Sequence, residues 1–349
     1  MNIVLQNVSK KYGDKFAVSD FSAEFCHGEV TTLLGPSGCG KTTLLNIVAG
    51  IIKPSNGSMS FDGQNVDQNA IENYSLGYVF QNYSLYPDMS VYDNISFPLV
   101  NIRPKHIPRK EYKLQVRDKV LKIARLLKID DLLDRLPTQL SGGQQQRIAI
   151  GRALVKEPDI LLMDEPFANL DKQLAVELRD EIRSIQKKLG ITLLFVTHNQ
   201  NDATVISDKV VLMDKGKIQQ IGRVEELYES PNNRFVAEFV GEGGINIMDR
   251  TVFNNEFSLK TMPIFNKEVS TVAFRPEHVN IFVSENDEEN CFCVENVINN
   301  GYCFTVILRS RGGIAIRAFS NVSFATGSKV SVEIKKIFLF DKDGANMWL

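Results

Sequence analysis

Apolar and polar residues follow two different periods along the chain, and the change of period divides it into two parts. In the first two thirds, short apolar runs are typical of buried strands and cover residues 30–34, 76–80, 160–163, 191–196 and 209–213. Longer amphipathic stretches separate these runs. This alternation of strand and helix predicts a mostly parallel sheet with helices packed around it.

The clearest predicted helix begins after Asp171. Spacings of three and four residues place its apolar side chains on one face, namely Leu174, Leu178, Ile182, Ile185 and Leu189. Lys187 and Lys188 suit the negative end of a helix, and Gly190 is a typical stop signal. A second helix is predicted over about 109–128, where one face carries Tyr112, Val116, Val120, Ile123 and Leu127.

The second part of the chain has a different period. Three glycines interrupt the chain near residue 240, at Gly241, Gly243 and Gly244, and no long helical period follows them. Val330, Val332 and Ile334 instead alternate with polar residues, as in a strand with one buried face.

Residues 302–308 are apolar on both faces, which predicts a central strand. Turn-forming residues separate the strand-like runs at 299–301, 311–313 and 326–327. We therefore expect an α/β domain over residues 1–238 and a small antiparallel β domain over residues 239–349.

Composition narrows the class of protein. The chain has 349 residues, 43% hydrophobic and 23% charged, with 40 Lys+Arg against 42 Asp+Glu and a net charge of −2. This balance argues against a general binder of the nucleic-acid backbone. Five cysteines, irregularly spaced, indicate reduced thiols. The first residues lack a signal-peptide layout, and no apolar run approaches a membrane span, so we expect a chain that is neither secreted nor membrane-spanning.

A glycine-rich segment after the strand at 30–34 matches the pattern G-x-x-x-x-G-K-[ST], and a plausible helix follows it at once. The segment consists of Gly35, Pro36, Ser37, Gly38, Cys39, Gly40, Lys41 and Thr42. The backbone N–H groups of such a loop surround phosphate oxygens, and the helix N-terminus adds partial positive charge. We expect Lys41 to reach the β and γ phosphates of a nucleotide, and the Thr42 hydroxyl to bind Mg²⁺. An ordinary strand–turn–helix would not need the full pattern.

The apolar run at 160–163 ends in two acids, Asp164 and Glu165. A buried strand of this kind would deliver Asp164 to the metal, as in phosphoryl-transfer sites generally. Glu165 follows directly and is placed to polarise the attacking water as a general base.

A second helix start also suits phosphate. The run Leu140, Ser141, Gly142, Gly143 and Gln144 precedes a predicted helix over 145–154. Ser141 is a good N-cap, and the paired glycines expose backbone N–H groups. One nucleotide does not need two such cradles from the same subunit, so we expect this helix start to face a nucleotide held by a partner subunit. A capped surface helix would explain Ser141 but not the glycines.

This Leu-Ser-Gly-Gly-Gln run is the signature of ATP-binding-cassette ATPases, and the chain resembles that family over its whole length. The resemblance implies a P-loop NTPase domain with an inserted helical subdomain at about 82–155. It also implies that the C-terminal part is a small all-β, OB-like regulatory domain.

The resemblance assigns further site residues. Tyr12 would stack on adenine, Thr43 would extend the ATP-binding loop, and Gln81 would touch Mg²⁺ and water and sense the transporter. His198, with Glu165 and Gln81, would complete the catalytic set by contacting the γ-phosphate. Thr42, Gln81 and Asp164 would form the Mg²⁺ site. The D-loop, which runs across the dimer interface, would comprise Asn169, Leu170 and Asp171.

Within the family, the chain resembles ATPases of bacterial importers. Residues 81–95 and the run Arg275-Pro276-Glu277-His278 look like the maltose and multiple-sugar subgroup, whereas residues 234–242 resemble ferric-iron, polyamine and sulfate relatives equally well. The resemblance implies an ATPase that energises solute import, with sugars or related carbohydrates as the expected solute. Ferric iron, polyamines and sulfate are the alternatives.

The implied assembly contains two ATPase subunits, either a homodimer or a pair with a second ATPase. It also contains two membrane-spanning permease subunits, and an extracellular solute-binding protein is an indirect partner. The resemblance places the chain at the cytoplasmic face of the membrane. ATP and Mg²⁺ are the implied cofactors. The sequence leaves open whether a regulator binds the β domain.

Three rival readings follow from the phosphate loop. A soluble cassette ATPase acting on nucleic acid or ribosomes usually has paired cassettes or a long coiled-coil insertion and basic surfaces, which this chain lacks. A phosphate-loop kinase would not need the signature helix or His198. The third reading is a regulatory module whose β domain binds a protein or a small effector. This role is compatible with the sequence and can exist beside the ATPase activity.

Two positions depart from what the loop and the resemblance lead us to expect. Asn199 stands where relatives usually carry Asp after the switch histidine, and the lost charge would shift the protonation of His198 in a direction that the sequence leaves open. Cys39 lies inside the phosphate loop, where its simplest role is that of a small residue that fits. Because a helix N-terminus can lower a thiol pKa, we also expect thiol reagents to inactivate the enzyme.

Overall fold

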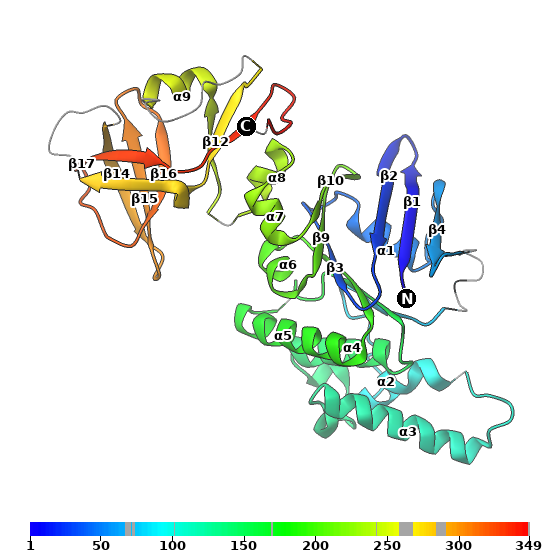
Figure 1. Ribbon diagram of the computed structural model, residues 1–349. Coiled ribbons are helices and arrows are strands. Elements are labelled where there is room, and N and C mark those ends of the chain that lie inside the picture. The colour runs from blue at the N-terminus through cyan, green and yellow to red at the C-terminus, as the bar shows by residue number, and fades with distance from the viewer. Residues whose placement is uncertain are drawn as a thin grey trace. The chain divides into compact units, whose positions relative to one another are not determined.

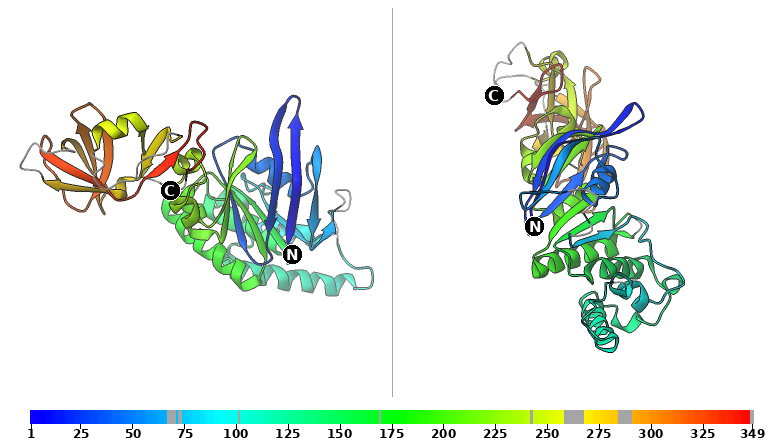
Figure 2. Two further views of the ribbon diagram at one scale, coloured as in Figure 1. Left: turned by 45° about the horizontal axis from the view of Figure 1, so that its top comes forward. Right: turned by 90° about the vertical axis from the view of Figure 1, so that its right-hand side faces the viewer.

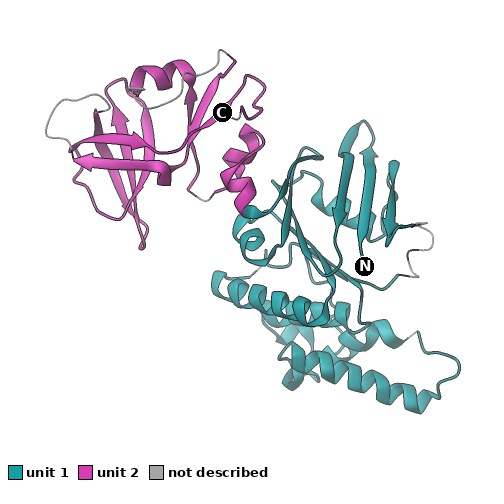
Figure 3. Ribbon diagram, in the orientation of Figure 1, with its two compact units in different colours: residues 1–224 teal, residues 225–349 magenta. Residues whose placement is uncertain are grey.

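The computed structural model describes residues 1–66, 71, 74–100, 102–168, 170–241, 243–257, 268–283 and 291–347. These residues form two compact units, Met1–Val224 and Glu225–Leu349, which Figure 3 shows in teal and magenta.

A six-stranded sheet forms the centre of the first unit (Figure 1), with the order β10-β9-β3-β8-β7-β6. Its strands are β3 Val30–Leu34, β6 Leu76–Val79, β7 Ile160–Asp164, β8 Thr192–Thr197, β9 Lys209–Asp214 and β10 Lys217–Gly222. All neighbouring pairs are parallel except β9 and β10. The mostly parallel sheet expected from the apolar runs is therefore confirmed.

Both faces of β3, β7 and β8 are buried, which explains why these strands are mostly apolar. In β8, Leu193 and Phe195 enter one core together with α2 to α5, whereas Leu194 and Val196 enter a second core with α1. The helices are α1 Lys41–Val48, α2 Val91–Val100, α3 Arg109–Leu126, α4 Gly142–Leu154, α5 Lys172–Leu189 and α6 Gln200–Ile206. None of the helices in the described ranges is long and apolar enough to cross a bilayer.

An antiparallel sheet covers the second core, and the sequence analysis did not predict it. Its order is β2-β1-β4-β5, with β1 Ile3–Tyr12, β2 Lys15–Phe25, β4 Asn56–Phe61 and β5 Gln64–Asn65. In Figure 1 and in the right view of Figure 2 the blue strands of this sheet and the helix α3 lie on opposite sides of the green helices α4 and α5.

Helix α5 follows the sequence prediction closely. The Asp171 side chain caps its start by accepting a hydrogen bond from the N–H of Leu174 at 3.0 Å, and Gly190 ends it with φ 65°. The apolar face ends earlier than the spacing implied, because Leu189 is 40% exposed. Two polar side chains, Arg179 and Gln186, are buried on this face instead.

The second unit is built mainly from antiparallel strands, as expected. Its larger sheet has the order β13-β17-β14-β15-β16, and the edge strands β13 and β16 also approach each other, so that the sheet curls into a small OB-like barrel. The strands are β11 Asn246–Asp249, β12 Thr271–Phe274, β13 Val279–Val283, β14 Cys291–Asn299, β15 Phe304–Ser310, β16 Ala315–Ser320, β17 Lys329–Ile334 and β18 Phe338–Phe340. The expected central strand is β15, although Tyr302 lies outside it and is 83% exposed.

The compact units divide after residue 224, whereas the domain boundary expected from the sequence lies at residue 238. Helices α7 Val224–Glu229 and α8 Arg234–Phe239 belong almost entirely to the second unit. Arg275 explains why, because its fully buried guanidinium donates to the backbone oxygens of Tyr228 and Val240 at 2.9 and 2.7 Å. Apolar periodicity alone does not reveal such a link between a helix end and a distant strand. The second unit also contains a third short helix, α9 Arg250–Glu256, which was not expected in an all-β domain.

Candidate active site

Four neighbouring strands of the central sheet end at the same edge and carry the residues singled out in the sequence. Their register pairs Leu34 with Thr197, Val196 with Asp164, and Met163 with Val79. The segments that follow β3, β8, β7 and β6 therefore start side by side. In open α/β sheets the crevice beyond the carboxyl ends of the strands is the usual ligand site.

The phosphate-loop segment after β3 needs its glycines. Gly40 is the N-cap of α1 with φ 106°, and a Cβ there would lie 2.1 Å from the backbone oxygen of Ala17. A Cβ at Gly35 would lie 2.3 Å from the backbone oxygen of Met213. No side chain caps α1, so its first N–H groups are available to an anion.

Lys41 is only 4% exposed, and its ammonium lies inside the loop. It donates to the backbone oxygens of Gly35 and Pro36, each at 2.9 Å. A charge held this closely over the loop is well placed to meet phosphate oxygens.

Thr42 and Asp164 come together as the sequence predicted for a Mg²⁺ site. The Thr42 hydroxyl donates to Asp164 Oδ1 at 3.0 Å. Burial raises the pKa of the Asp164 carboxyl, and the hydrogen bond from Thr42 opposes this shift. The described residues contain no cluster of three or more His, Cys, Asp or Glu side chains suited to a metal. A hydroxyl and a carboxylate nevertheless suit Mg²⁺, because this ion takes hard oxygen ligands and usually completes its shell with phosphates and water.

The segments that follow β8 and β6 each bring a side chain to Glu165. His198 Nδ1 lies 3.1 Å from Glu165 Oε2, and Gln81 Nε2 donates to the same oxygen at 3.5 Å. The backbone of Glu165 is held at φ 43°, in the left-handed region that side-chain-bearing residues rarely adopt. Its N–H is bonded to the oxygen of Val196 at 3.0 Å, which fixes this strained conformation.

Cys39 does not have the environment that the sequence suggested. Its side chain is 3% exposed, and burial raises the pKa of the thiol, although the nearby Lys41 opposes the shift. Desolvation therefore outweighs the opposing effect of Lys41 on this thiol. We conclude that Cys39 acts as a small packing residue and that thiol reagents reach it poorly.

The signature segment forms the start of α4, as predicted. Ser141 is the N-cap, and its hydroxyl accepts the N–H of Gln144 at 3.4 Å while Gln144 Oε1 accepts the N–H of Ser141 at 3.0 Å. Gly143 is buried, and a Cβ there would lie 2.3 Å from Leu174 Cδ2 in the first turn of α5. The second glycine is thus needed for close packing of two helices.

Comparison with known proteins agrees with this geometry. The family model described as "ABC transporter" matches residues 18–168. The spermidine/putrescine import ATP-binding protein PotA of Haemophilus influenzae is 38% identical over 314 residues, which cover 86% of this chain and 82% of the relative. The chain belongs to the ABC transporter family.

Further relatives differ in the solute that their names state. The trehalose/maltose import ATP-binding protein MalK of Thermococcus litoralis is 38% identical over 97% of both chains. The Fe(3+) ions import ATP-binding protein FbpC of Fusobacterium nucleatum is 43% identical, covering 70% of this chain and 64% of the relative. The chain is accordingly an ATPase of the importer type, which hydrolyses ATP to ADP and phosphate.

Solved structures support the same assignment. The cassette cbiO1 from Clostridium perfringens matches with a TM-score of 0.60 and 32% identity, covering 65% of this chain and 90% of that one. A dimeric post-hydrolysis state of the cassette MJ0796 with ADP and Pi matches with a TM-score of 0.55 and 29% identity, covering 63% and 98%.

The structure places most of the remaining residues predicted for the site of this ABC ATPase. Tyr12 ends β1 with a 51% exposed ring, whose centroid lies 5.3 Å from the ammonium of Lys10. Leu170 is partly buried and Asp171 caps α5, whereas Asn169 lies outside the described residues. Asn199 caps α6, because its side chain accepts the N–H of Asn201 at 2.9 Å, a role that Asp would fill equally well.

Local sequence patterns did not indicate three buried polar residues that lie close to the His198 turn. Thr197, Asp202 and Arg179 are 3%, 5% and 7% exposed and form a connected polar chain. The available signal was Arg179, a charged residue one position from the apolar stripe of a predicted helix. Its partner lies beyond the next strand, so no local pattern could identify it.

Proposed function

We propose that Mg²⁺-ATP binds with its phosphates in the Gly35–Thr42 loop and its adenine against Tyr12. Glu165 would then act as the general base, with His198 and Gln81 as its neighbours. One observation carries this proposal: a single carboxylate oxygen, Glu165 Oε2, is approached from two other strand ends by His198 and Gln81. The Thr42–Asp164 pair lies one residue away along β7.

Each side chain has a defined task in this proposal. Lys41 binds the phosphate oxygens, and the Glu165 carboxylate accepts a proton from the attacking water. His198 and Gln81 orient that carboxylate and the water. Thr42, Asp164 and Gln81 would hold Mg²⁺, which supplies positive charge against the charge that develops on the phosphate oxygens.

The second helix start is proposed to complete the site of a partner subunit. The N–H groups around Leu140–Gln144 would contact the γ-phosphate of ATP bound to the phosphate loop of the other chain. ATP then favours the closed dimer, because its phosphates touch both subunits only in that state. The dimeric form of the similar cassette supports this proposal.

We further propose that the dimer docks on two membrane-spanning permease subunits at the cytoplasmic face. An extracellular solute-binding protein would bring the solute to these permeases. Residues 83–91 would form part of the docking surface for a permease helix. Tyr83 is buried and Tyr92 packs against the core, so of the three tyrosines only Tyr86, 40% exposed beside Phe97, offers its ring to a partner. The barrel of the second unit would serve regulation.

The proposed solute is a polyamine, with a carbohydrate as the second candidate. Among the similar import ATPases, PotA of Lawsonia intracellularis is 42% identical over 95% of this chain and 94% of its own. The carbohydrate expected from residues 81–95 is supported by the likeness to MalK along the full chain.

Reconstitution tests both parts of this proposal. The chain would be purified with the membrane proteins that accompany it from detergent-solubilised membranes and placed in liposomes. We expect two membrane-spanning partners, and an ATPase rate that rises when spermidine and the cognate solute-binding protein are added. Stimulation by maltose or trehalose instead would select the carbohydrate. Co-purification with ribosomes or nucleic acid, without permeases, would contradict an import function.

A further inference from the structure

Helix α5 carries two arginines four residues apart, and each forms an ion pair with an aspartate that follows β8. Arg179 pairs with Asp202, and Arg183 pairs with Asp208. Residues four apart on a helix lie on the same face, so both arginines point toward the central sheet. The two pairs nevertheless meet the sheet at opposite ends.

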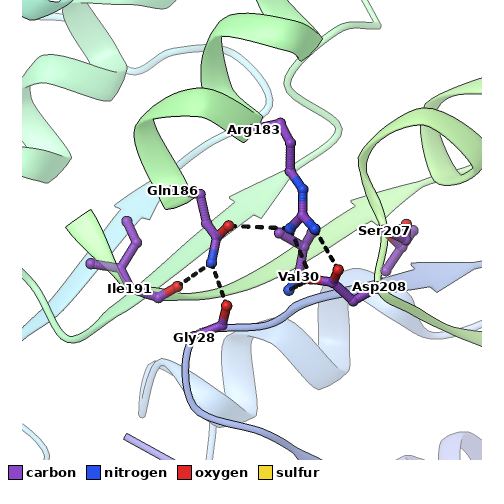
Figure 4. A network of polar contacts seen from close by, with 8 residues as sticks. Gly28, Val30, Arg183, Gln186, Ile191, Ser207 and Asp208 are labelled. Carbon is purple, nitrogen blue, oxygen red and sulfur yellow. Dashed lines mark hydrogen bonds and ion pairs between the residues drawn. The ribbon is translucent and has the colours of Figure 1, made fainter. Parts of the chain in front are cut away.

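The Arg183–Asp208 pair lies at the end where the parallel strands begin (Figure 4). Asp208 Oδ2 accepts the N–H of Val30, the first residue of β3, at 2.8 Å. Gln186 strengthens this end by donating to the backbone oxygens of Gly28 and Ile191, each at 2.7 Å. Burial raises the pKa of the Asp208 carboxyl, but the hydrogen bonds from Arg183 and Val30 outweigh it and lower the pKa overall. This end is remote from the candidate site.

The Arg179–Asp202 pair lies at the other end, beside His198. Arg179 Nη1 is 3.2 Å from Asp202 Oδ1, with side chains only 8% and 7% exposed. Asp202 Oδ2 accepts the hydroxyl of Thr197 at 2.9 Å. The Thr197 oxygen in turn accepts the N–H of Asn199 at 3.0 Å. The residues on both sides of His198 are therefore held by one buried carboxylate.

We propose that Arg179 and Asp202 are positioning residues for ATP hydrolysis, which hold the His198 turn in register with α5. The proposal rests on the role of His198 proposed above and adds the group that fixes its orientation. His198 contacts Glu165 at 3.1 Å, so a displaced turn would also change the surroundings of the base.

The same helix touches the signature segment, which gives the pair a second consequence. Leu174 in the first turn of α5 packs against Gly143 at the start of α4. Arg179 also donates from Nε to the backbone oxygen of Ala175, which locks its side chain along the helix. A shift of α4 when ATP of the partner subunit binds would therefore reach His198 through one rigid helix and one ion pair.

A buried ion pair adds little net stability, because both charges lose their hydration. We therefore infer that the Arg179–Asp202 pair serves to fix the geometry of the turn. Removing one partner leaves an uncompensated charge, while an apolar pair of the same volume is often equally stable. Burial raises the pKa of Asp202, and the Thr197 hydroxyl and Arg179 both oppose this shift. Without Arg179 the carboxyl is therefore easier to protonate and its hold on Thr197 changes.

Steady-state ATPase kinetics of Arg179→Met, with Arg183→Met as the matched control, test the proposal. Both variants remove a guanidinium from the same helix face. We expect Arg179→Met to lose about tenfold in kcat with KM for ATP within about twofold, since small misplacements of catalytic groups cost rate more than binding. Arg183→Met should keep kcat and KM while its melting temperature falls. Arg179→Lys should recover part of the lost kcat.

Asp202→Asn provides a second readout that does not depend on the stability of the Arg179 variant. The chain has four histidines, so the His198 ring resonance can be identified by its absence in His198→Gln. Asp202→Asn and Arg179→Met should both move this resonance, and Arg183→Met should not. The inference is overturned if Arg179→Met has wild-type kcat, or if kcat falls equally in both arginine variants. In either case an inactive Glu165→Gln would leave the proposed function standing.

Discussion

The two helix starts that suit phosphate differ in how their N–H groups are used. At α1 no side chain caps the helix, Gly40 turns the backbone through φ 106°, and the buried Lys41 lies over the loop. At α4 Ser141 and Gln144 cap each other, and the side chain of neither contributes a positive charge. One start thus offers free donors with a cation, whereas the other is self-capped and neutral.

In our proposal, this difference makes the second start one half of a site. The α1 start stands beside the Thr42–Asp164 pair and the Glu165 carboxylate, so in our proposal it binds the nucleotide and supplies the base, while the partner's helix start completes the site. The α4 start has a capping box that can yield its N–H groups to a stronger anion, because charged acceptors form stronger hydrogen bonds than neutral ones. In our proposal, it gains such an acceptor when a second chain presents ATP.

The largest expected effect comes from Glu165→Gln, which separates binding at the α1 start from turnover. Loss of the general base should lower kcat by about a hundredfold or more, because such groups typically contribute 10²–10⁴-fold. ATP affinity should be retained, and the mutant should accumulate as an ATP-bound dimer. Phosphate release and size-exclusion chromatography measure the two outcomes, and hydrolysis at the wild-type rate would remove Glu165 from its role.

Lys41→Ala and Ser141→Ala sharpen the comparison between the two starts. Lys41→Ala should weaken ATP binding by about 10- to 100-fold, as expected for lost charge-assisted hydrogen bonds of about 1.5–3 kcal/mol. Ser141→Ala should leave the affinity of the monomer for ATP unchanged and cost about 1 kcal/mol of unfolding free energy through the lost cap. A fluorescent nucleotide titration measures the affinities. Equal affinity loss in both variants would contradict the assignment of nucleotide binding in the monomer to the α1 start.

Gly143→Ala tests whether the α4 start depends on close packing with α5. The new Cβ would lie 2.3 Å from Leu174 Cδ2, so we expect a loss of about 1–3 kcal/mol from overpacking and a lower ATPase rate. ATP binding at the α1 start should persist. The double variant Gly143→Ala/Leu174→Ala removes the clash and should recover part of the rate. If it recovers none, the defect does not arise from packing.

The smallest effect is expected at Cys39, where burial and the helix start act in opposite directions. Because burial raises the pKa of this thiol, maleimide should label the exposed Cys293 well before Cys39. Peptide mapping after short exposure gives the order of labelling. Rapid modification of Cys39 with loss of activity would show that the field of the helix start prevails.

The sequence predicted the part of the fold that local patterns determine. Mostly apolar runs identify β3, β7 and β8 because both of their faces are buried, and the caps of α5 are local signals. The antiparallel strands β1 and β2 were missed, because buried and exposed residues do not alternate regularly along them. Register shifts in the pairing of the two strands account for this irregularity. The compact units divide earlier than the expected domain boundary, because Arg275 links α7 and α8 to a segment far along the chain.

The candidate site shows the same division. Lys41, Thr42, Asp164 and the signature segment follow from motifs whose members are close in sequence, and the structure brings each to the expected strand or helix end. The environment of Cys39 was not predictable, because burial depends on β2 and β9 packing over the loop. Arg179 and Asp202 were missed for a related reason: a charge on an apolar helix face has meaning only once its partner is placed.

The central claim is that each ATP site is shared between two chains, and mixing two defective variants tests it most directly. Lys41→Ala disables the loop and Ser141→Arg blocks the helix start, so each homodimer should be inactive. A mixed dimer has one site with both defects and one with neither. Equimolar mixing should therefore restore about one quarter of the wild-type ATPase rate if dimers exchange freely and the sites act independently. No recovery in mixtures shown to contain mixed dimers would contradict the shared site.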